Sequence, residues 1–215
     1  MPFLKRRRFV SVIGRKSTVP DGLWTKCRGC TKAVASTELE ENLMVCPQCG
    51  YHERIGARQR IELLVDSGSF EETHAQIRSG DPLQFVIPEA SYSYPEKAER
   101  ARAKSDMSES IITGFASIDS ARIVLGVMDF SFMGGSMGSA LGEKFCRAAD
   151  DAIANRIPYV VFTASGGARM EEGILGLMQM AKTSEGVRAL NEAAVPYIVV
   201  LTHPTTGGVF ASFAS

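Results

Sequence analysis

The stretch Tyr159–Gly173, which reads YVVFTASGGARMEEG, decides the fold class of this chain. It begins with a continuous run of β-branched and aromatic residues, Tyr159–Phe162, as in a parallel strand that is covered on both faces. The glycines Gly166 and Gly167 follow, and a helical pattern begins after them. Glycines allow a sharp turn and a close approach of a ligand to the backbone, and the free N–H groups at a helix start point at that ligand. The stretch therefore predicts a strand–turn–helix unit that suits an oxyanion.

The same order of strand, glycine pair and helix occurs twice more. The apolar run Ile123–Phe130 precedes Gly134 and Gly135, and the run Tyr197–Thr202 precedes Gly207 and Gly208. Successive glycine pairs are 32 and 41 residues apart. Similarity at such periods indicates a repeated supersecondary unit that stacks on itself. The alternative is that the pairs only mark turns, and three pairs in equivalent places argue against it.

The remaining pattern predicts a hairpin and several helices. Ile111–Ile118 and Ala121–Phe130 flank Asp119 and Ser120 and predict the hairpin. A short strand or two is expected within residues 70–110. Helices are expected over Tyr51–Ser67, Glu96–Lys104, Ser139–Asn155 and Gly173–Asn191. Cys146 stands alone on the third of these helices, and we expect it to be a small core residue.

Four cysteines form two C-x2-C pairs with fifteen residues between the pairs. They are Cys27, Cys30, Cys46 and Cys49. This spacing is typical of a four-thiolate zinc site, in which each pair forms a tight knuckle. The intervening Thr31–Val45 is long enough for a hairpin. Four thiolates fill the tetrahedron, so the zinc should be structural. Two disulfides are the alternative, which is disfavoured because nothing in the sequence indicates secretion.

Composition indicates a globular protein with an uneven distribution of charge. The chain has 215 residues, 45% hydrophobic and 22% charged, and its net charge is zero. Residues 1–32 nevertheless carry nine basic residues and one acid. Such a segment could contact nucleic acid, phosphates or an acidic partner, or could be a solvated tail. No apolar run reaches the ~20 residues of a membrane span, and the basic start lacks the apolar region of a secretory signal. We expect a cytoplasmic protein, or one of the plastid stroma if the source is a plant.

The cysteine pairs, followed by FMGGSMGS, SGGARM, LMQMAKTS and PTTGG, resemble the carboxyltransferase β subunit of bacterial and plastid acetyl-CoA carboxylase. The resemblance runs from about Leu23 to the end of the chain. It implies an α/β fold, a crotonase-like superhelix of ββα units behind a small four-Cys zinc ribbon. The expected domains are a basic lead-in at 1–22, the ribbon at 23–52 and the carboxyltransferase domain at 53–215. Family members commonly run further, so we expect this domain to be truncated and its superhelix incomplete.

The resemblance also implies a reaction and partners. The carboxyl group of carboxybiotin, carried by a biotinyl carrier protein, passes to acetyl-CoA and gives malonyl-CoA for fatty-acid biosynthesis. Implied partners are the carrier protein, biotin carboxylase and a carboxyltransferase α subunit, in a complex of two α and two β subunits. We expect the chain to be active only with them. His203 departs from the family pattern, in which we expect Asp before the PTTGG loop.

This reaction needs no side-chain base, because the ureido anion left by loss of CO2 can remove a methyl proton from acetyl-CoA. The protein must stabilise the thioester enolate and the ureido oxygen, which backbone N–H groups can do. The predicted catalytic donors, or walls of the acetyl-CoA site, are Gly166, Gly167, Gly207 and Gly208. Candidates for the CoA site are Gly134, Gly135 and Arg169. Arg169 could reach a CoA phosphate or stand in a structural ion pair.

A zinc ribbon with a basic arm is also a nucleic-acid-binding device. The alternative function is therefore a nucleic-acid-binding protein on an inactive crotonase-like scaffold, and such binding could also be a secondary role. Salt-dependent binding to RNA or DNA that disappears when Met1–Lys32 is removed would support it.

Overall fold

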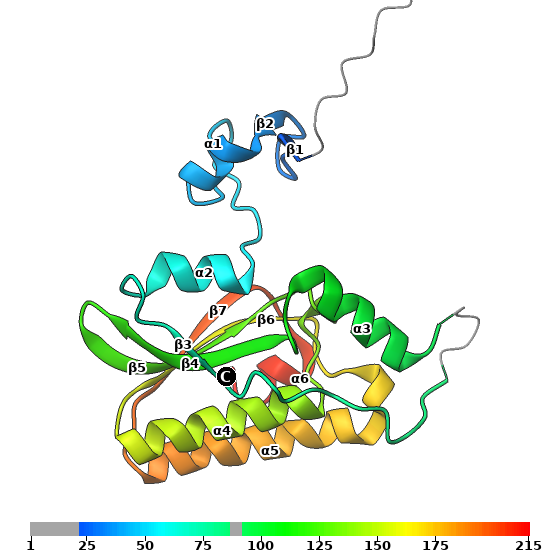
Figure 1. Cartoon of the computed structure of the whole chain (residues 1–215), viewed down its shortest axis with the longest axis vertical. Helices are drawn as coiled ribbons and strands as arrows, with labels where there is room; N and C mark the ends of the chain where they lie inside the picture. The colour runs from blue at the N-terminus through cyan, green and yellow to red at the C-terminus, as the bar shows by residue number, and fades with distance from the viewer. Residues whose placement is uncertain (1–21, 87–91) are drawn as a thin grey trace, which may run out of the picture. The chain divides into compact units, whose positions relative to one another are not determined.

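The computed structural model describes residues 22–86 and 92–215. Most of the expected basic lead-in at 1–22 lies outside the described residues. The chain divides into two compact units, Met1–Arg54 and Ile55–Ser215, and Figure 1 labels the elements of both.

The first unit is a small ribbon built around the four cysteines. Strands β1 (Trp24–Lys26) and β2 (Ala33–Ala35) pair antiparallel, and helix α1 (Ser36–Glu41) follows directly. This corrects the expectation of a hairpin between the two cysteine pairs, because the hairpin instead encloses the first pair. The reason is local, since the sequence STELEE of α1 is rich in good helix formers and takes up the space before the second pair.

The second unit contains a five-stranded mixed sheet in the order β3-β4-β5-β6-β7. Its strands are β3 (Glu71–Thr73), β4 (Ile111–Ile118), β5 (Ala121–Met128), β6 (Tyr159–Ser165) and β7 (Tyr197–Thr205). The first three strands are antiparallel, and β5, β6 and β7 are parallel. The predicted hairpin is confirmed: β4 and β5 are joined through Asp119 and Ser120, whose φ angles of 48° and 68° suit a type I′ turn.

Helices cover both faces of this sheet (Figure 1). They are α2 (Ala57–Leu64), α3 (Tyr94–Ser105), α4 (Ser139–Asn155), α5 (Gly173–Glu192) and the short α6 (Gly207–Phe210). The 3-10 turns η1 (Met133–Gly135) and η2 (Met170–Glu172) lie in the loops. α4 and α5 form as predicted. α2 is shorter than the predicted Tyr51–Ser67, because the chain before it is extended up to Gly56 and the N–H of Ala57 donates to Asp129 Oδ2 at 2.7 Å.

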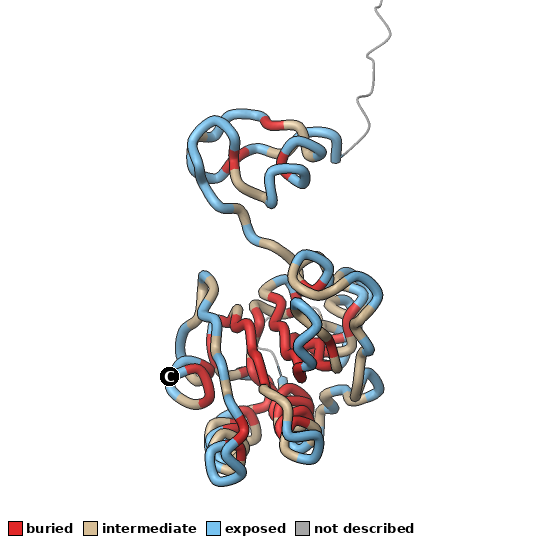
Figure 2. Tube along the Cα trace, turned by 90° about the vertical axis from the view of Figure 1, so that its left-hand side faces the viewer, coloured by how far each residue is buried: buried red, intermediate tan, exposed pale blue. Residues whose placement is uncertain are grey.

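The core lies on both faces of the sheet, where Figure 2 shows the buried chain in red. Along β6, Tyr159 and Val161 belong to the apolar cluster under α4, whereas Val160 and Phe162 belong to the cluster on the opposite face. The continuous apolar run of this strand therefore has the predicted explanation, burial on both sides. Cys146 is half-buried against the first cluster, as expected of a small core residue.

The strand–glycine–helix units are connected in series. β4, β5 and α4 form one ββα unit, and the next two units contribute one strand and one helix each, β6 with α5 and β7 with α6. All three units place their glycine pair just after a parallel strand, at the carboxyl edge of the sheet. In the part of the chain that the structure describes, no helix has both the length and the apolar character that crossing a membrane requires.

Candidate active site and metal centre

The three glycine pairs meet at the carboxyl edge of the parallel strands. They are called here the first, second and third glycine loops, at residues 134–135, 166–167 and 207–208. The N–H of Gly166 donates to the carbonyl oxygen of Gly134 at 2.9 Å, which joins the first two loops. The second and third loops touch through backbone, since a Cβ built on Gly207 would lie 3.0 Å from Gly167 Cα. Segments far apart in the sequence thus form one cluster of glycine backbone.

In the structure, the four predicted donors differ in whether their N–H groups already have an acceptor within the protein. In the second loop both N–H groups are used within the protein: Gly166 donates to Gly134, and Gly167 donates to Ser165 Oγ at 3.0 Å. In the third loop, Gly207 and Gly208 open helix α6, where N–H groups lack acceptors within the helix. Elsewhere among residues 22–86 and 92–215, neither of them has an acceptor. The third loop therefore offers the free donors, and the second loop forms a wall beside them.

The first glycine loop packs closely against the end of β6, the strand that leads into the second loop. Gly135 is buried with φ of +62°, and a Cβ on it would lie 1.9 Å from the carbonyl oxygen of Ala164. Only glycine allows the two loops to approach this closely. The assignment of Gly134 and Gly135 to the CoA site stays a prediction; in the structure Gly134 accepts a hydrogen bond from Gly166, and Gly135 packs against Ala164 and Ser165 at the end of β6.

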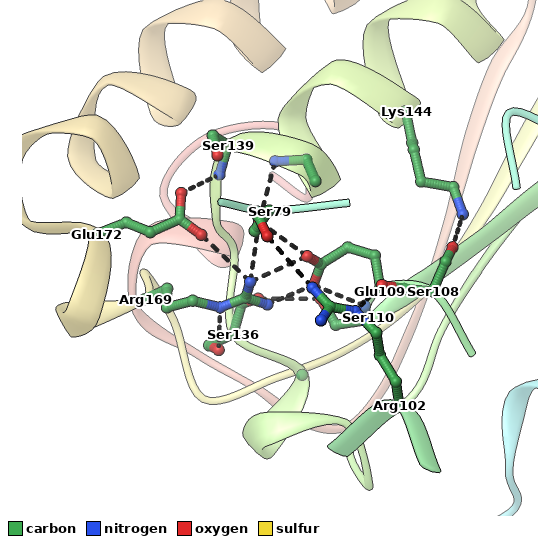
Figure 3. Close-up of polar contacts among 12 residues, drawn as sticks. Ser79, Arg102, Ser108, Glu109, Ser110, Ser136, Ser139, Lys144, Arg169 and Glu172 are labelled. Carbon is green, nitrogen blue, oxygen red and sulfur yellow. Dashed lines mark hydrogen bonds and ion pairs between the residues drawn. The ribbon is translucent and has the colours of Figure 1, made fainter. Parts of the chain in front are cut away.

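Arg169 is fully buried, and Figure 3 shows the polar groups that surround its guanidinium. Its guanidinium forms a two-pronged contact with the Glu109 carboxylate, and Nη1 lies 3.2 Å from Glu172 Oε1. Its Nε donates to Ser136 Oγ at 3.1 Å, and Nη2 donates to the Ser136 carbonyl oxygen at 2.9 Å. The sequence left open whether Arg169 reaches a CoA phosphate or stands in an ion pair, and its side chain has no exposed surface in the structure. The structural ion pair is the role that the geometry supports.

The charges of this cluster are mutually stabilised. Burial alone would raise the pKa of Glu109, but Arg169 outweighs burial and leaves that pKa below its ordinary value. Burial likewise opposes ionisation of Glu172, whose pKa is nevertheless lowered by hydrogen bonds from Ser139 and Tyr94. The ionised cluster therefore ties α3, β4 and α4 to the chain that leaves the second loop.

Sequence reasoning missed three partners of Arg169, namely Ser79, Tyr94 and Glu109. All come from residues 70–110, for which the sequence supported no chemical claim. One signal was present: Glu109 is a charged residue directly before an apolar strand, where burial demands a partner. The identity of that partner, 60 residues away, had no signal in the sequence.

The four cysteines of the ribbon fit a zinc ion. Their sulfur atoms all lie within 4.8 Å of one another. Four sulfurs held ~2.3 Å from one centre at tetrahedral angles are about 3.8 Å apart. The Sγ atoms of Cys27 and Cys49 are 3.7 Å apart, and those of Cys30 and Cys46 are 3.9 Å apart. All five cysteines of the chain are free, so the disulfide alternative is wrong. The closed set of four ligands gives this metal a structural role.

Fold and site together define a carboxyl transferase domain that carries a zinc ribbon. Residues 52–215 match the family described as Carboxyl transferase domain, and residues 24–49 match the Acetyl-CoA carboxylase zinc finger domain. The chain belongs to the family of acetyl-CoA carboxylase carboxyl transferase β subunits, as its curated relatives show.

Two of these relatives are named acetyl-coenzyme A carboxylase carboxyl transferase subunit beta. That of Carboxydothermus hydrogenoformans is 47% identical over 215 residues, which cover 99% of this chain and 75% of the relative. That of Citrifermentans bemidjiense is 48% identical over 196 residues, which cover 91% and 68%.

Solved structures share the fold. Transcarboxylase 12S, with methylmalonyl-coenzyme A and methylmalonic acid bound, is similar with a TM-score of 0.60 and 28% identity, over 75% of this chain and 28% of that one. A Pseudomonas malonate decarboxylase hetero-tetramer has a TM-score of 0.53 at 24% identity, over 70% and 51%. These likenesses confirm the predicted crotonase-like carboxyltransferase fold.

Proposed function

We propose that this chain transfers the carboxyl group of carboxybiotin to acetyl-CoA and so forms malonyl-CoA for fatty-acid biosynthesis. The observation that carries this proposal is the meeting of the three glycine loops, which leaves the N–H groups of Gly207 and Gly208 without acceptors among the described residues. Both units of the chain match families of this enzyme class, which supports carboxyl transfer over an inactive scaffold.

The chemistry explains why the site is made of backbone. When carboxybiotin loses CO2, negative charge remains on the ureido group, which takes a proton from the acetyl methyl group. The resulting enolate carries its charge on the thioester oxygen and then attacks CO2. N–H groups fixed in advance stabilise such oxygens without reorganisation. We assign the donor role to Gly207 and Gly208, and the role of a wall of the acetyl-CoA site to Gly166 and Gly167.

Reconstitution tests this function. The chain is mixed with a carboxyltransferase α subunit, biotin carboxylase and biotinyl carrier protein, and malonyl-CoA is measured. Activity is expected only in the complete mixture. Absence of malonyl-CoA from a complete and correctly assembled mixture would contradict the function. Malonyl-CoA formed by this chain alone from free carboxybiotin would contradict only the dependence on partners.

The exposed side of α5 supports a contact with the α subunit. The apolar residues Met170, Ile174, Leu177 and Met178 are between 54% and 81% exposed. Met170 lies in η2, which precedes α5, whereas Ile174, Leu177 and Met178 are three and four residues apart on one side of α5, where a monomer would carry polar groups. A contiguous apolar surface of this kind is typical of a protein–protein interface. It begins three residues after the second glycine loop, so a subunit bound there would border the site.

A charge placed in the stripe formed by Met170, Ile174, Leu177 and Met178 tests the contact with the α subunit. Leu177→Glu should abolish co-purification with the α subunit, because an unpaired carboxylate would be buried. Ser184→Glu introduces the same charge at an exposed position on the same side of α5, about two turns beyond Leu177 and past the end of the stripe, and should leave assembly intact. Assembly of the Leu177→Glu variant at normal strength would exclude this surface. The cytoplasmic location stays a prediction.

A secondary nucleic-acid role has one supporting observation. Trp24 is 62% exposed, and Lys26 follows it two residues later on the same face of β1. Exposed aromatic and basic side chains together are typical of single-strand binders. We propose weak, salt-dependent binding of single-stranded RNA or DNA, which Trp24→Ala should reduce. If the Trp24→Ala variant and the wild-type protein bind single-stranded RNA or DNA equally well, this role loses its support.

A further inference from the structure

Ser165, the last residue of β6, contacts the first two glycine loops and the residue directly before the third. Its side chain is fully buried. The hydroxyl donates to the carbonyl oxygen of Gly135 at 2.6 Å and accepts from the N–H of Gly167 at 3.0 Å. Its backbone carbonyl accepts from the N–H of Thr206 at 3.0 Å, directly before the third loop. One residue therefore bridges the first loop, the second loop and the residue that precedes the third.

We propose that Ser165 is a positioning residue, which fixes the register of the three glycine loops so that the N–H groups of Gly207 and Gly208 face the substrate oxyanion. The inference rests on the proposed carboxyl transfer, since it assigns a role within that reaction. Ser165 does not contact the substrate in this scheme, and it acts through the glycines.

A hydroxyl is suited to this role. It supplies one proton to a carbonyl and a lone pair to an N–H, so a single small side chain can satisfy one group from each of two loops. An alanine would leave both the Gly135 carbonyl and the Gly167 N–H buried without this partner. Buried backbone groups require partners, and the second loop would therefore shift or loosen to find others.

Such a shift would reach the proposed donors directly. A Cβ built on Gly167 would lie 3.3 Å from Gly207 Cα and 3.4 Å from the nitrogen of Gly208. The second loop is thus packed against the donor nitrogen itself, with no side chain between them to absorb a displacement. Misplacement of catalytic groups by ~1 Å can cost ~10²-fold in rate.

The competing explanation is that Ser165 only stabilises the fold. Thr163 provides the matched control, because it lies two residues earlier on β6 and is equally buried. Its hydroxyl is 2.9 Å from Thr205 Oγ1 and contacts no glycine loop. Ser165→Ala and Thr163→Val each remove one buried hydroxyl from the same strand, but only the first removes a contact with the loops.

The experiment uses the reconstituted enzyme, with kcat, the KM for acetyl-CoA and the melting temperature measured for each variant. Ser165→Ala is expected to lower kcat by ~10-fold to ~10²-fold, with KM changed less than about twofold. Thr163→Val should keep kcat near wild type at a comparable loss of melting temperature. Ser165→Cys, whose thiol is a weaker donor and acceptor, should fall between wild type and Ser165→Ala.

Normal kcat in folded Ser165→Ala would overturn the proposal, as would equal losses of kcat in the Ser165 and Thr163 variants. If the wild-type complex forms no malonyl-CoA, the proposed function fails instead, and amide hydrogen exchange then tests the register by itself. Faster exchange of peptides over residues 165–168 and 206–208 in Ser165→Ala, but not in Thr163→Val, would support the bridging role. Unchanged exchange would overturn it.

Discussion

Gly167 and Gly207 lie back to back, although 40 residues separate them in the sequence: a Cβ on either would come within 3.0 to 3.3 Å of the other's Cα. The contact is between main chains, so no side-chain movement can relieve an added group. Gly167 also has φ of +124°, a conformation that side chains rarely adopt. The second glycine loop is consequently sensitive to substitution even though both of its N–H groups are already used.

Gly167→Ala should lower kcat in the reconstituted enzyme. The added methyl group crowds the third loop, and the backbone must change or carry a strain of ~1–3 kcal/mol. If Gly208 is displaced as a donor, the loss in kcat should approach the ~10²–10³ found when one oxyanion donor is removed. Steady-state kinetics and a thermal melt of the same preparation provide the measurement.

Gly186→Ala is the matched control for that variant. It adds the same methyl group to helix α5, where the nearest atom would be Cys146 Sγ at 3.5 Å, an ordinary contact. Normal turnover and equal or slightly higher stability are expected, because Ala is the better helix former. Wild-type kcat in well-folded Gly167→Ala would show that the loop contact does not matter for turnover.

Gly135→Ala should act on stability. The new Cβ would lie 1.9 Å from the Ala164 carbonyl oxygen, so the first and second loops must separate. Overpacking of this kind costs ~1–3 kcal/mol or more, which urea unfolding would measure. Gly80→Ala, with nothing within 4 Å of its new Cβ, should be near neutral. Unfolding of Gly135→Ala at the wild-type urea midpoint would contradict the close approach of these loops.

The glycine loops and the cysteine cluster could be predicted from sequence because each depends on local pattern. A strand followed by two glycines and a helix specifies its own geometry, and parallel strands bring such turns to one edge of a sheet. The C-x2-C spacing of Cys27 with Cys30, and of Cys46 with Cys49, similarly predicts two knuckles that direct their sulfurs at one metal. Both features could be predicted without knowing any contact between residues that are distant in the sequence.

The ion pair of Arg169 with Glu109 and the bridging role of Ser165 could not be predicted. Both depend on partners 30 to 60 residues away, and no periodicity records such contacts. The N–H group of Gly166 was expected to be free for the same reason, since its acceptor, the Gly134 carbonyl oxygen, is 32 residues away. The acceptor of Gly167 is local, the hydroxyl of Ser165 two residues earlier, but the sequence does not show that this side chain turns back to the loop. The sequence pattern of strand, glycine pair and helix located the site, whereas tertiary contacts determine which glycine N–H groups remain free to bind a ligand.

The ionised Glu109 should make stability depend on pH. Burial raises its pKa, Arg169 lowers it by more, and the folded value lies below the usual one. Its contribution is therefore present above the unfolded pKa of about 4.3 and is lost as pH falls through the lower folded value. Glu109→Gln should cost ~3–5 kcal/mol at pH 7, because it leaves a buried charge less well paired. The difference in stability between the variant and wild type should begin to narrow as pH falls below about 4.3 and should vanish only below the folded pKa of Glu109.

Urea unfolding at several pH values measures this effect. Glu185→Gln serves as the control, since Glu185 forms an exposed pair with Arg188 on α5 and should change stability little in physiological salt. A constant difference between wild type and Glu109→Gln from pH 7 to pH 3 would mean that Glu109 is not ionised in the folded protein.

Zinc should hold the ribbon together. Among the residues of this unit that the structure describes, four are buried core residues: two are the proposed ligands Cys27 and Cys46, and only Val34 and Leu39 supply ordinary apolar burial. So small a core cannot stabilise a domain, so metal binding must supply the folding free energy. The purified full-length chain is expected to contain one zinc per molecule. Cys46→Ser should lower the zinc content and expose the ribbon to proteolysis.

The chain supplies its own control for this prediction. Cys146→Ser changes the one cysteine outside the cluster, and it should leave the zinc content at one per chain. The unit Ile55–Ser215 has its own apolar core on both faces of its sheet, so a chelator should unfold the ribbon before this unit. Metal analysis of a Cys27→Ser/Cys46→Ser double variant decides the assignment, because two ligands cannot hold a structural zinc. Stoichiometric zinc in that variant would place the metal elsewhere in the chain.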